Sequence, residues 1–133
     1  MAIKAFQGNT LTKSERLCSQ KKIQELFKKG SSFYIYPFRF QFVIQESEEQ
    51  VNVPEMLVSV PKRTFKKANA RNFLKRRTKE AYRLNKQILL RSPEFAEKKV
   101  IIAFIYTAKE KLSFHFIEKK LILGLERLVS SQK

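Results

Sequence analysis

The 133-residue sequence contains one cysteine, one histidine, three glycines, four prolines and no tryptophan. Because Cys18 is alone, the chain can form no internal disulfide and no zinc site with several thiolates. His115 is the only histidine that could act as a general base, and a lone histidine on an amphipathic helix is usually a surface or boundary residue. The sequence therefore does not predict a self-sufficient hydrolytic enzyme, and its thiol content is typical of a reducing, cytoplasmic setting.

Long hydrophobic runs are also absent. No apolar run approaches the roughly 18 residues of a membrane-spanning helix. The opening MAIKAFQGNT has neither the apolar core nor the small-residue cleavage site of a signal peptide. We expect residues 1–12 to be a flexible leader and residues 13–133 to form one domain that does not bind membranes. The 43% hydrophobic content, with 12 phenylalanines, is enough for a core.

Acidic residues are few. The chain has 12 of them against 28 lysines and arginines, which gives a net charge of +16 and a pI near 10.2. Such an excess destabilises a compact fold through self-repulsion, and it is useful chiefly beside a polyanion. Nucleic acid is the first candidate for that partner.

Hydrophobic periodicity predicts six elements in a single domain. They are a helix at residues 19–29, strands at 38–44 and 51–60, a helix at 68–90, a strand at 100–106 and a helix at 113–130. The apolar stripe of the last helix is predicted to consist of Phe114, Ile117, Leu121, Leu125 and Leu128. Gly30 marks the end of the first helix, Pro37 the start of the first strand, and a polar, acidic turn at 46–50 joins the two strands. This order predicts a small α+β or α/β sandwich.

The most basic segment joins the second strand to the second helix. The 22 residues 62–83 contain ten basic residues and one acid, Glu80. On a helical wheel one face, about 140° wide, is basic and the opposite face is apolar. The basic face consists of Arg71, Asn72, Lys75, Arg76, Lys79 and Arg83, and the apolar face of Ala70, Leu74, Ala81 and Ile88, with Arg77 near the edge of the core.

A solvated helix normally alternates acids and bases four residues apart, which stabilises it. Here Arg71, Lys75 and Lys79 repeat the same charge at that spacing, which costs helix stability. The pattern therefore favours a helix face that binds a polyanion, with arginines suited to phosphate. No helix-turn-helix partner or zipper accompanies this helix, so DNA is not the expected ligand.

Two interpretations of the aromatic residues remain open. Phe38, Phe40 and Phe42 alternate along the first predicted strand and are either core residues or a stacking surface for single-stranded nucleic acid. Phe27 on the first helix has the same two interpretations. The second interpretation favours RNA.

The stretch SVPKRTFKKANARNFLKRRTKEAYR, at residues 59–83, resembles the signature of the bacterial ribonuclease P protein subunit. SERLCSQKKIQELFKKGSSF resembles that family's opening, and KKVIIAFIYT with the last helix matches its order of elements. Two positions differ from the family pattern. Phe73 stands where the family usually has arginine, and Arg77 where it often has an apolar residue.

The resemblance implies a function that the spacing alone does not. The family is the small, non-catalytic protein subunit of a ribonucleoprotein endonuclease that removes the 5′ leader from precursor tRNA, with chemistry performed by the RNA subunit using Mg²⁺. It implies a cytoplasmic protein, monomeric when isolated, whose partners are the catalytic RNA and precursor tRNA. The alternative is a structural, ribosomal-type RNA-binding protein with no processing role.

The resemblance also implies the fold and the two binding surfaces. The fold is an α-β sandwich like the second domain of ribosomal protein S5, with a mainly antiparallel sheet, three helices and a left-handed βαβ crossover. The implied catalytic-RNA-binding residues are Lys66, Lys67, Arg71, Asn72, Lys75, Arg76, Lys79 and Arg83. The leader would lie in a cleft between the first helix and the sheet, against Phe27, Phe38, Phe40, Phe42, Lys62 and Arg63.

Overall fold

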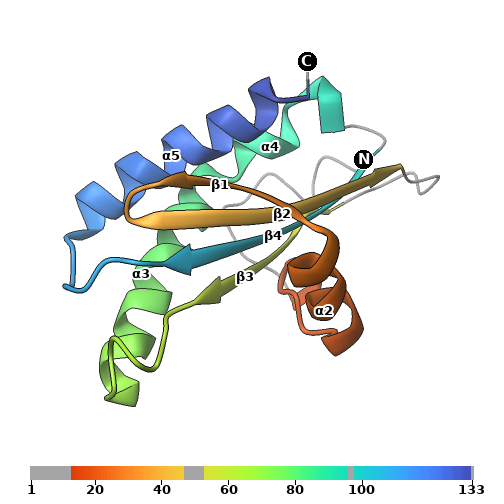
Figure 1. Ribbon diagram of the computed structural model, residues 1–133. Coiled ribbons are helices and arrows are strands. Elements are labelled where there is room, and N and C mark those ends of the chain that lie inside the picture. Colours follow the sequence, from red (N-terminus) through yellow and green to blue (C-terminus); the bar gives the residue numbers. More distant parts are fainter. Residues whose placement is uncertain (1–12, 47–52, 96–97, 133) are drawn as a thin grey trace.

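The computed structural model describes residues 13–46, 53–95 and 98–132. Figure 1 shows the elements, which in chain order are η1 (Lys13–Glu15), α2 (Gln20–Lys29), β1 (Ser31–Ile35), β2 (Phe38–Glu46), β3 (Glu55–Ser59), α3 (Ala68–Asn85), α4 (Gln87–Leu90), η2 (Pro93–Phe95), β4 (Lys98–Tyr106) and α5 (Phe114–Ser130). The expected leader at 1–12 and residues 47–50 of the expected acidic turn at 46–50 lie outside the described residues, whereas Glu46 ends β2. No helix in the described ranges is long and apolar enough to cross a membrane.

The strands form one sheet in the order β1-β2-β4-β3. β2 is antiparallel to both β1 and β4, whereas β3 is parallel to β4. Parallel neighbours need a crossover, and α3 supplies it between β3 and β4. The predicted α+β sandwich with a mainly antiparallel sheet is therefore confirmed. The left hand of the crossover remains what the family resemblance implies.

Helices cover both faces of the sheet. Figure 1 shows α3, α4 and α5 on one side and α2 on the other. The main core lies on the first side, where Phe38, Phe40 and Phe104 of the sheet pack against both long helices. The α5 stripe predicted from the sequence supplies Ile117, Leu121, Leu125 and Leu128, all fully buried. The helical period of this stripe thus gave the core face correctly.

One close approach fixes the distance between α5 and the sheet. Gly124 of α5 packs directly on the ring of Phe40, and a Cβ at this glycine would lie 2.0 Å from the ring atom Cζ. Since the ring is fully buried, a larger residue at Gly124 would force it out of position.

A second, smaller core lies beneath α2 on the opposite face. Leu26 of α2 packs there with Leu17, Ile101 and Ala103. Gln41 is buried on the same face, and its Nε2 donates hydrogen bonds to the carbonyl oxygens of Leu26 and Gly30, at 3.1 and 3.2 Å. This amide adds two hydrogen bonds at the C-terminal end of α2, where the Leu26 carbonyl also accepts from the Gly30 N–H, and it ties α2 to β2.

Most of the element boundaries predicted from the sequence lie within two or three residues of those in the structure. Ser19 and Ser113 cap α2 and α5 through their side chains, as polar residues at helix starts commonly do. The prediction missed β1, a short edge strand whose alternating Phe33 and Ile35 precede a cis Tyr36–Pro37 peptide. The predicted helix at 68–90 was also too long, because the chain turns at residue 86 and continues as the short α4.

Candidate RNA interface

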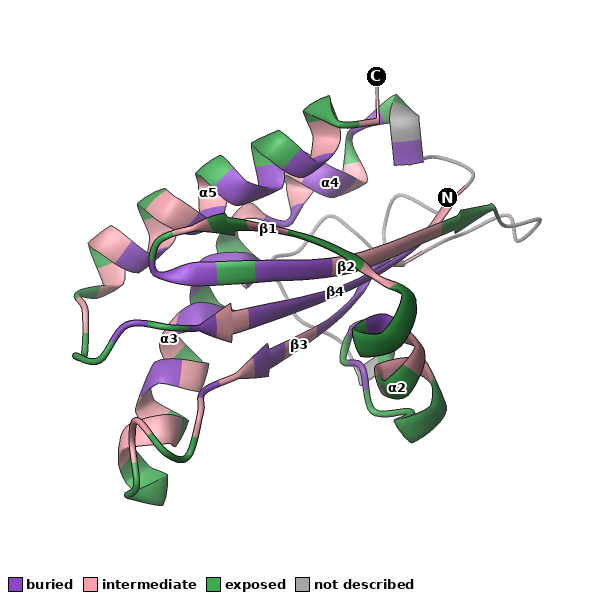
Figure 2. Ribbon diagram, in the orientation of Figure 1, coloured by how far each residue is buried: buried purple, intermediate pink, exposed green. Residues whose placement is uncertain are grey.

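The helix α3 has the two faces that its sequence predicted. Leu74, Thr78, Ala81 and Tyr82 are buried against the core. On the other side Asn72 and Arg76 are exposed, while Lys75, Lys79 and Arg83 are partly exposed. Figure 2 shows the exposed residues gathering at the N-terminal end of this helix. A continuous basic surface therefore remains open to a ligand.

Arg71 lies on this surface, but its guanidinium is already engaged. Nη1 donates hydrogen bonds to the carbonyl oxygens of Phe65 and Lys66, at 2.8 and 2.9 Å. These bonds hold the turn before α3, where Lys66 and Lys67 are exposed. Arg71 thus positions two other cations in addition to carrying a charge itself.

Arg83 has a partner on its own helix. Its Nε and Nη2 donate to the two carboxylate oxygens of Glu80, at 2.9 and 2.6 Å. The hydrogen bond from Arg83 lowers the pKa of Glu80, so the pair is charged on both sides at neutral pH. This carboxylate offsets one cation at the far end of the basic surface.

The prediction that Phe38 and Phe40 contact a leader beside the first helix was wrong. Both side chains are fully buried in the main core. Phe42 is half-buried and packs against the same core. The reason is the strand period of two, which directs all three rings away from α2 and toward α5. Of the two interpretations left open, the core interpretation is correct for Phe38 and Phe40.

The face of the sheet beside α2 carries a different set of side chains. The strand register aligns Tyr34, Arg39, Ile105 and Ser59 in one row across all four strands. Tyr34 and Arg39 are exposed, and Ile105 and Ser59 are half-buried. The Tyr34 hydroxyl shares a hydrogen bond of 3.1 Å with the Thr107 hydroxyl, which fixes the tyrosine ring.

The small core beneath α2 does not extend to this row. Ala103 belongs to that core and lies directly opposite Gln41, a pair two residues away from the row along β4 and β2. Both are buried, whereas Arg39 remains exposed. Phe27 of α2 is 45% exposed, which leaves much of its ring available for stacking. The sequence indicated this surface through Arg39 and Gln41, the polar residues that alternate with the phenylalanines of β2.

Lys62 and Arg63 are exposed, as a binding role requires. They follow β3 directly and precede α3. They therefore lie between the row that ends at Ser59 and the basic surface of α3. The expected leader residues Phe27, Lys62 and Arg63 remain accessible, in contrast to Phe38 and Phe40.

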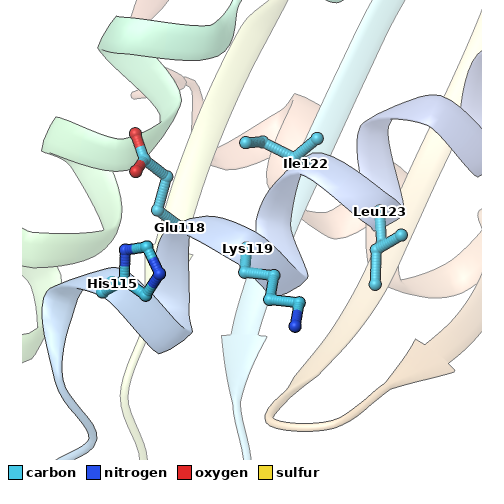
Figure 3. A pocket seen from close by; sticks show the side chains of 5 residues that line it. All are labelled: His115, Glu118, Lys119, Ile122 and Leu123. Carbon is cyan, nitrogen blue, oxygen red and sulfur yellow. The ribbon is translucent and has the colours of Figure 1, made fainter.

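The lone histidine lies at the start of α5. His115 is exposed there, as expected for a surface or boundary residue. It lines an open hollow of about 370 Å³ together with Glu118, Lys119, Ile122 and Leu123. Figure 3 shows these five side chains, all on α5. Within residues 13–46, 53–95 and 98–132, no group of three His, Cys, Asp or Glu side chains could hold a metal ion.

A basic crossover helix in an α+β fold, beside a sheet face that exposes Tyr34 and Arg39, is typical of an RNA-binding protein. The family model described as Ribonuclease P matches residues 11–129. The ribonuclease P protein component of Porphyromonas gingivalis W83 is 36% identical over 121 residues, covering 91% of this chain and 88% of that protein. This chain belongs to the ribonuclease P protein family.

Solved structures agree with this assignment. The RNase P protein from Thermotoga maritima superposes with a TM-score of 0.66 at 27% identity, covering 85% of this chain and 96% of that one. The Staphylococcus aureus RNase P protein shares the fold, with a TM-score of 0.62 at 20% identity over 91% of this chain and all of the other. The chain is thus a protein subunit of the ribonucleoprotein enzyme that acts in tRNA processing, and the alternative of a ribosomal-type protein is set aside.

Proposed function

We propose that the basic surface of α3 and the turn before it bind the catalytic RNA. The contacts are made by Lys66, Lys67, Arg71, Asn72, Lys75, Arg76, Lys79 and Arg83. The observation that carries this proposal is that Lys75, Arg76 and Lys79 have no carboxylate partner among the described residues, although all three are accessible. Unneutralised cations on one helix face are stabilised when they bind phosphate.

We further propose that the 5′ leader of precursor tRNA crosses the face beside α2. Bases can stack on Phe27 and Tyr34, while Arg39 can bind the backbone or stack on a base. Lys62 and Arg63 bind phosphates where this surface meets the catalytic-RNA surface. Phe42 is no longer part of the proposal because its ring packs on the other side of the sheet.

In this mechanism the protein contributes binding and charge screening. The RNA subunit and its precursor substrate are both polyanions, and a subunit of charge +16 reduces their mutual repulsion. The Mg²⁺ that serves hydrolysis is held by the RNA subunit, and the protein lowers the concentration required. The isolated protein is a monomer and works in the cytoplasm, where precursor tRNA is made.

Cleavage of a 5′-labelled precursor tRNA at low Mg²⁺ tests the proposal. The catalytic RNA is supplied alone, with the protein, and beside a control with protein alone. We expect the protein to stimulate cleavage only when the RNA is present. Binding of about five phosphates also predicts a log–log slope of affinity against salt near −4. A flat salt dependence, or absence of stimulation by a folded protein, would exclude the proposed surfaces.

A further inference from the structure

Phe73 is the residue of α3 that departs from the family's usual arginine, and two cations contact its ring. The guanidinium carbon of Arg77 is 4.3 Å from the ring centroid, and Nζ of Lys111 is 5.6 Å from it. Phe73 itself is half-buried and packs against the main core. A rigid aromatic ring therefore positions one cation from α3 and one from the connection between β4 and α5.

Neither cation has an acidic partner in the described part of the chain. The ion pairs found there involve other basic residues. Nε of Arg77 is buried and has no hydrogen-bond partner among these residues. A buried donor without a partner costs free energy, and two cations that contact the same ring repel each other. A bound anion would relieve the repulsion.

Cation–π contacts alone do not account for this arrangement. Such contacts stabilise a single cation on a ring, but they supply no acceptor for the guanidinium N–H groups. Arginine binds phosphate oxygens through two parallel hydrogen bonds, and an adjacent lysine adds a point charge. A phosphodiester group satisfies both requirements, which neither water nor the ring does.

We propose that Arg77 and Lys111, held by Phe73, bind a backbone phosphate of RNA. This inference rests on the proposed function and extends the RNA-binding surface from α3 onto the connection at residues 107–113. It also explains how the chain tolerates Phe73, because neighbouring side chains supply the positive charge that an arginine would carry at that position.

The double variant Arg77→Gln with Lys111→Gln tests the site directly. Affinity for the ribonuclease P RNA is measured against salt concentration, and circular dichroism checks the fold. Loss of this one phosphate contact reduces the magnitude of the log–log slope by about 1 and weakens binding about tenfold at low salt. Lys111→Gln alone alters an exposed side chain, so it tests the site even if the double variant unfolds.

A matched control removes the same charge from similar contacts elsewhere. Arg127 lies 4.6 Å from the Phe33 ring centroid, and Lys120 lies 5.3 Å from that of Phe116. The double variant Lys120→Gln with Arg127→Gln should change the slope and affinity little. Equal losses in the two double variants would indicate a general charge effect and overturn the proposal.

A rescue variant and a measurement with precursor tRNA complete the test. Phe73→Arg in the Arg77→Gln, Lys111→Gln background should restore most of the lost affinity by returning a cation to the site. Measurements with precursor tRNA bound to the assembled enzyme show whether the phosphate belongs to the substrate instead. Loss with either RNA supports the site, and loss with neither overturns it. Failure of the unaltered protein to bind the ribonuclease P RNA would instead exclude the proposed function.

Discussion

Nζ of Lys86 lies 3.0 and 2.9 Å from the two carboxylate oxygens of Glu15, and both side chains are buried. The two residues are 71 positions apart in the chain. Their ion pair joins the first described turn to the junction of α3 and α4. The neighbouring Tyr82 is fully buried, and burial together with the charge of Glu15 raises its pKa.

Replacing one partner of this buried pair should be strongly destabilising. Lys86→Met removes the lysine that neutralises the buried Glu15 carboxylate, which costs about 3–5 kcal/mol of unfolding free energy. Adding Glu15→Gln removes the carboxylate charge as well and should restore much of the loss. Urea unfolding measures both variants. Lys22→Met breaks a half-exposed pair with Glu55 and should cost about 1 kcal/mol or less. Similar losses for Lys86→Met and Lys22→Met would contradict the burial argument.

The Glu80 carboxylate should weaken RNA binding. Glu80→Gln removes one negative charge beside Arg83 and weakens the ion pair between them, so affinity for the ribonuclease P RNA should rise by roughly two- to fivefold at low salt. Glu126→Gln removes the same charge from an exposed position on α5 and serves as the control. Identical gains would show that net charge alone matters, and that Arg83 makes no specific contact.

Arg71 should act through geometry as well as charge. Arg71→Lys keeps the positive charge, but the ammonium group cannot reproduce the guanidinium fork that binds Phe65 and Lys66. We expect affinity for the catalytic RNA to fall by several-fold, because Lys66 and Lys67 lose their fixed position. Arg76→Lys, which breaks no hydrogen bond found in the described residues, changes only its own phosphate contact and should lower affinity less at the same salt concentration. Equal effects would rule out the positioning role.

Two sets of variants distinguish a leader-binding role of the surface beside α2 from a purely structural role in the core. Phe27→Ala with Tyr34→Ala removes two exposed rings, and base stacking contributes about 1–3 kcal/mol per base. Affinity of the assembled enzyme for leader-bearing precursor should therefore fall at least about tenfold, while affinity for mature tRNA should not change. Phe40→Ala should instead lower the unfolding free energy by about 3–5 kcal/mol. A leader-independent loss in the first variant would refute the stacking surface.

Glu55 gives the stability of the protein a defined pH dependence. Burial would raise its pKa, but hydrogen bonds and charges from Lys99 and Lys22 outweigh burial and lower it below 4.5. A lowered pKa in the folded state means that this stabilisation is complete above the unfolded pKa and is lost as pH falls through the folded pKa. Urea unfolding from about pH 6 to pH 3 should thus show a decline that Glu55→Gln reduces. An unchanged decline would assign the effect to other carboxylates.

Local periodicity explains what could be predicted about α3 and α5. Side chains three and four residues apart share a helix face whatever the rest of the fold does. The buried positions Leu74 and Leu121 were therefore correctly assigned from sequence, as was the accessible face containing Arg76. The same argument correctly placed Arg77 at the edge of the core.

The alternation of side chains along a strand does not show which helix covers each face of the sheet. Alternation separated Phe40 from Arg39 and Gln41, but only the chain path places α5 over the first side and α2 over the second. The family resemblance placed the rings beside α2, and the tertiary structure corrected this. Tyr34 was overlooked because it lies in β1, a strand of five residues that is too short for its alternation to be recognised in the sequence.

The sequence by itself determined the charge, the helix faces, the element order apart from β1, and the family to which this chain belongs. Those properties depend on composition and on residues close together in the chain. The tertiary structure alone decided that Glu15 meets Lys86, that Arg71 fixes the turn before α3, and that Lys111 joins Arg77 on the ring of Phe73. These contacts depend on how the elements pack, and sequence spacing carries no information about side chains brought together from distant segments.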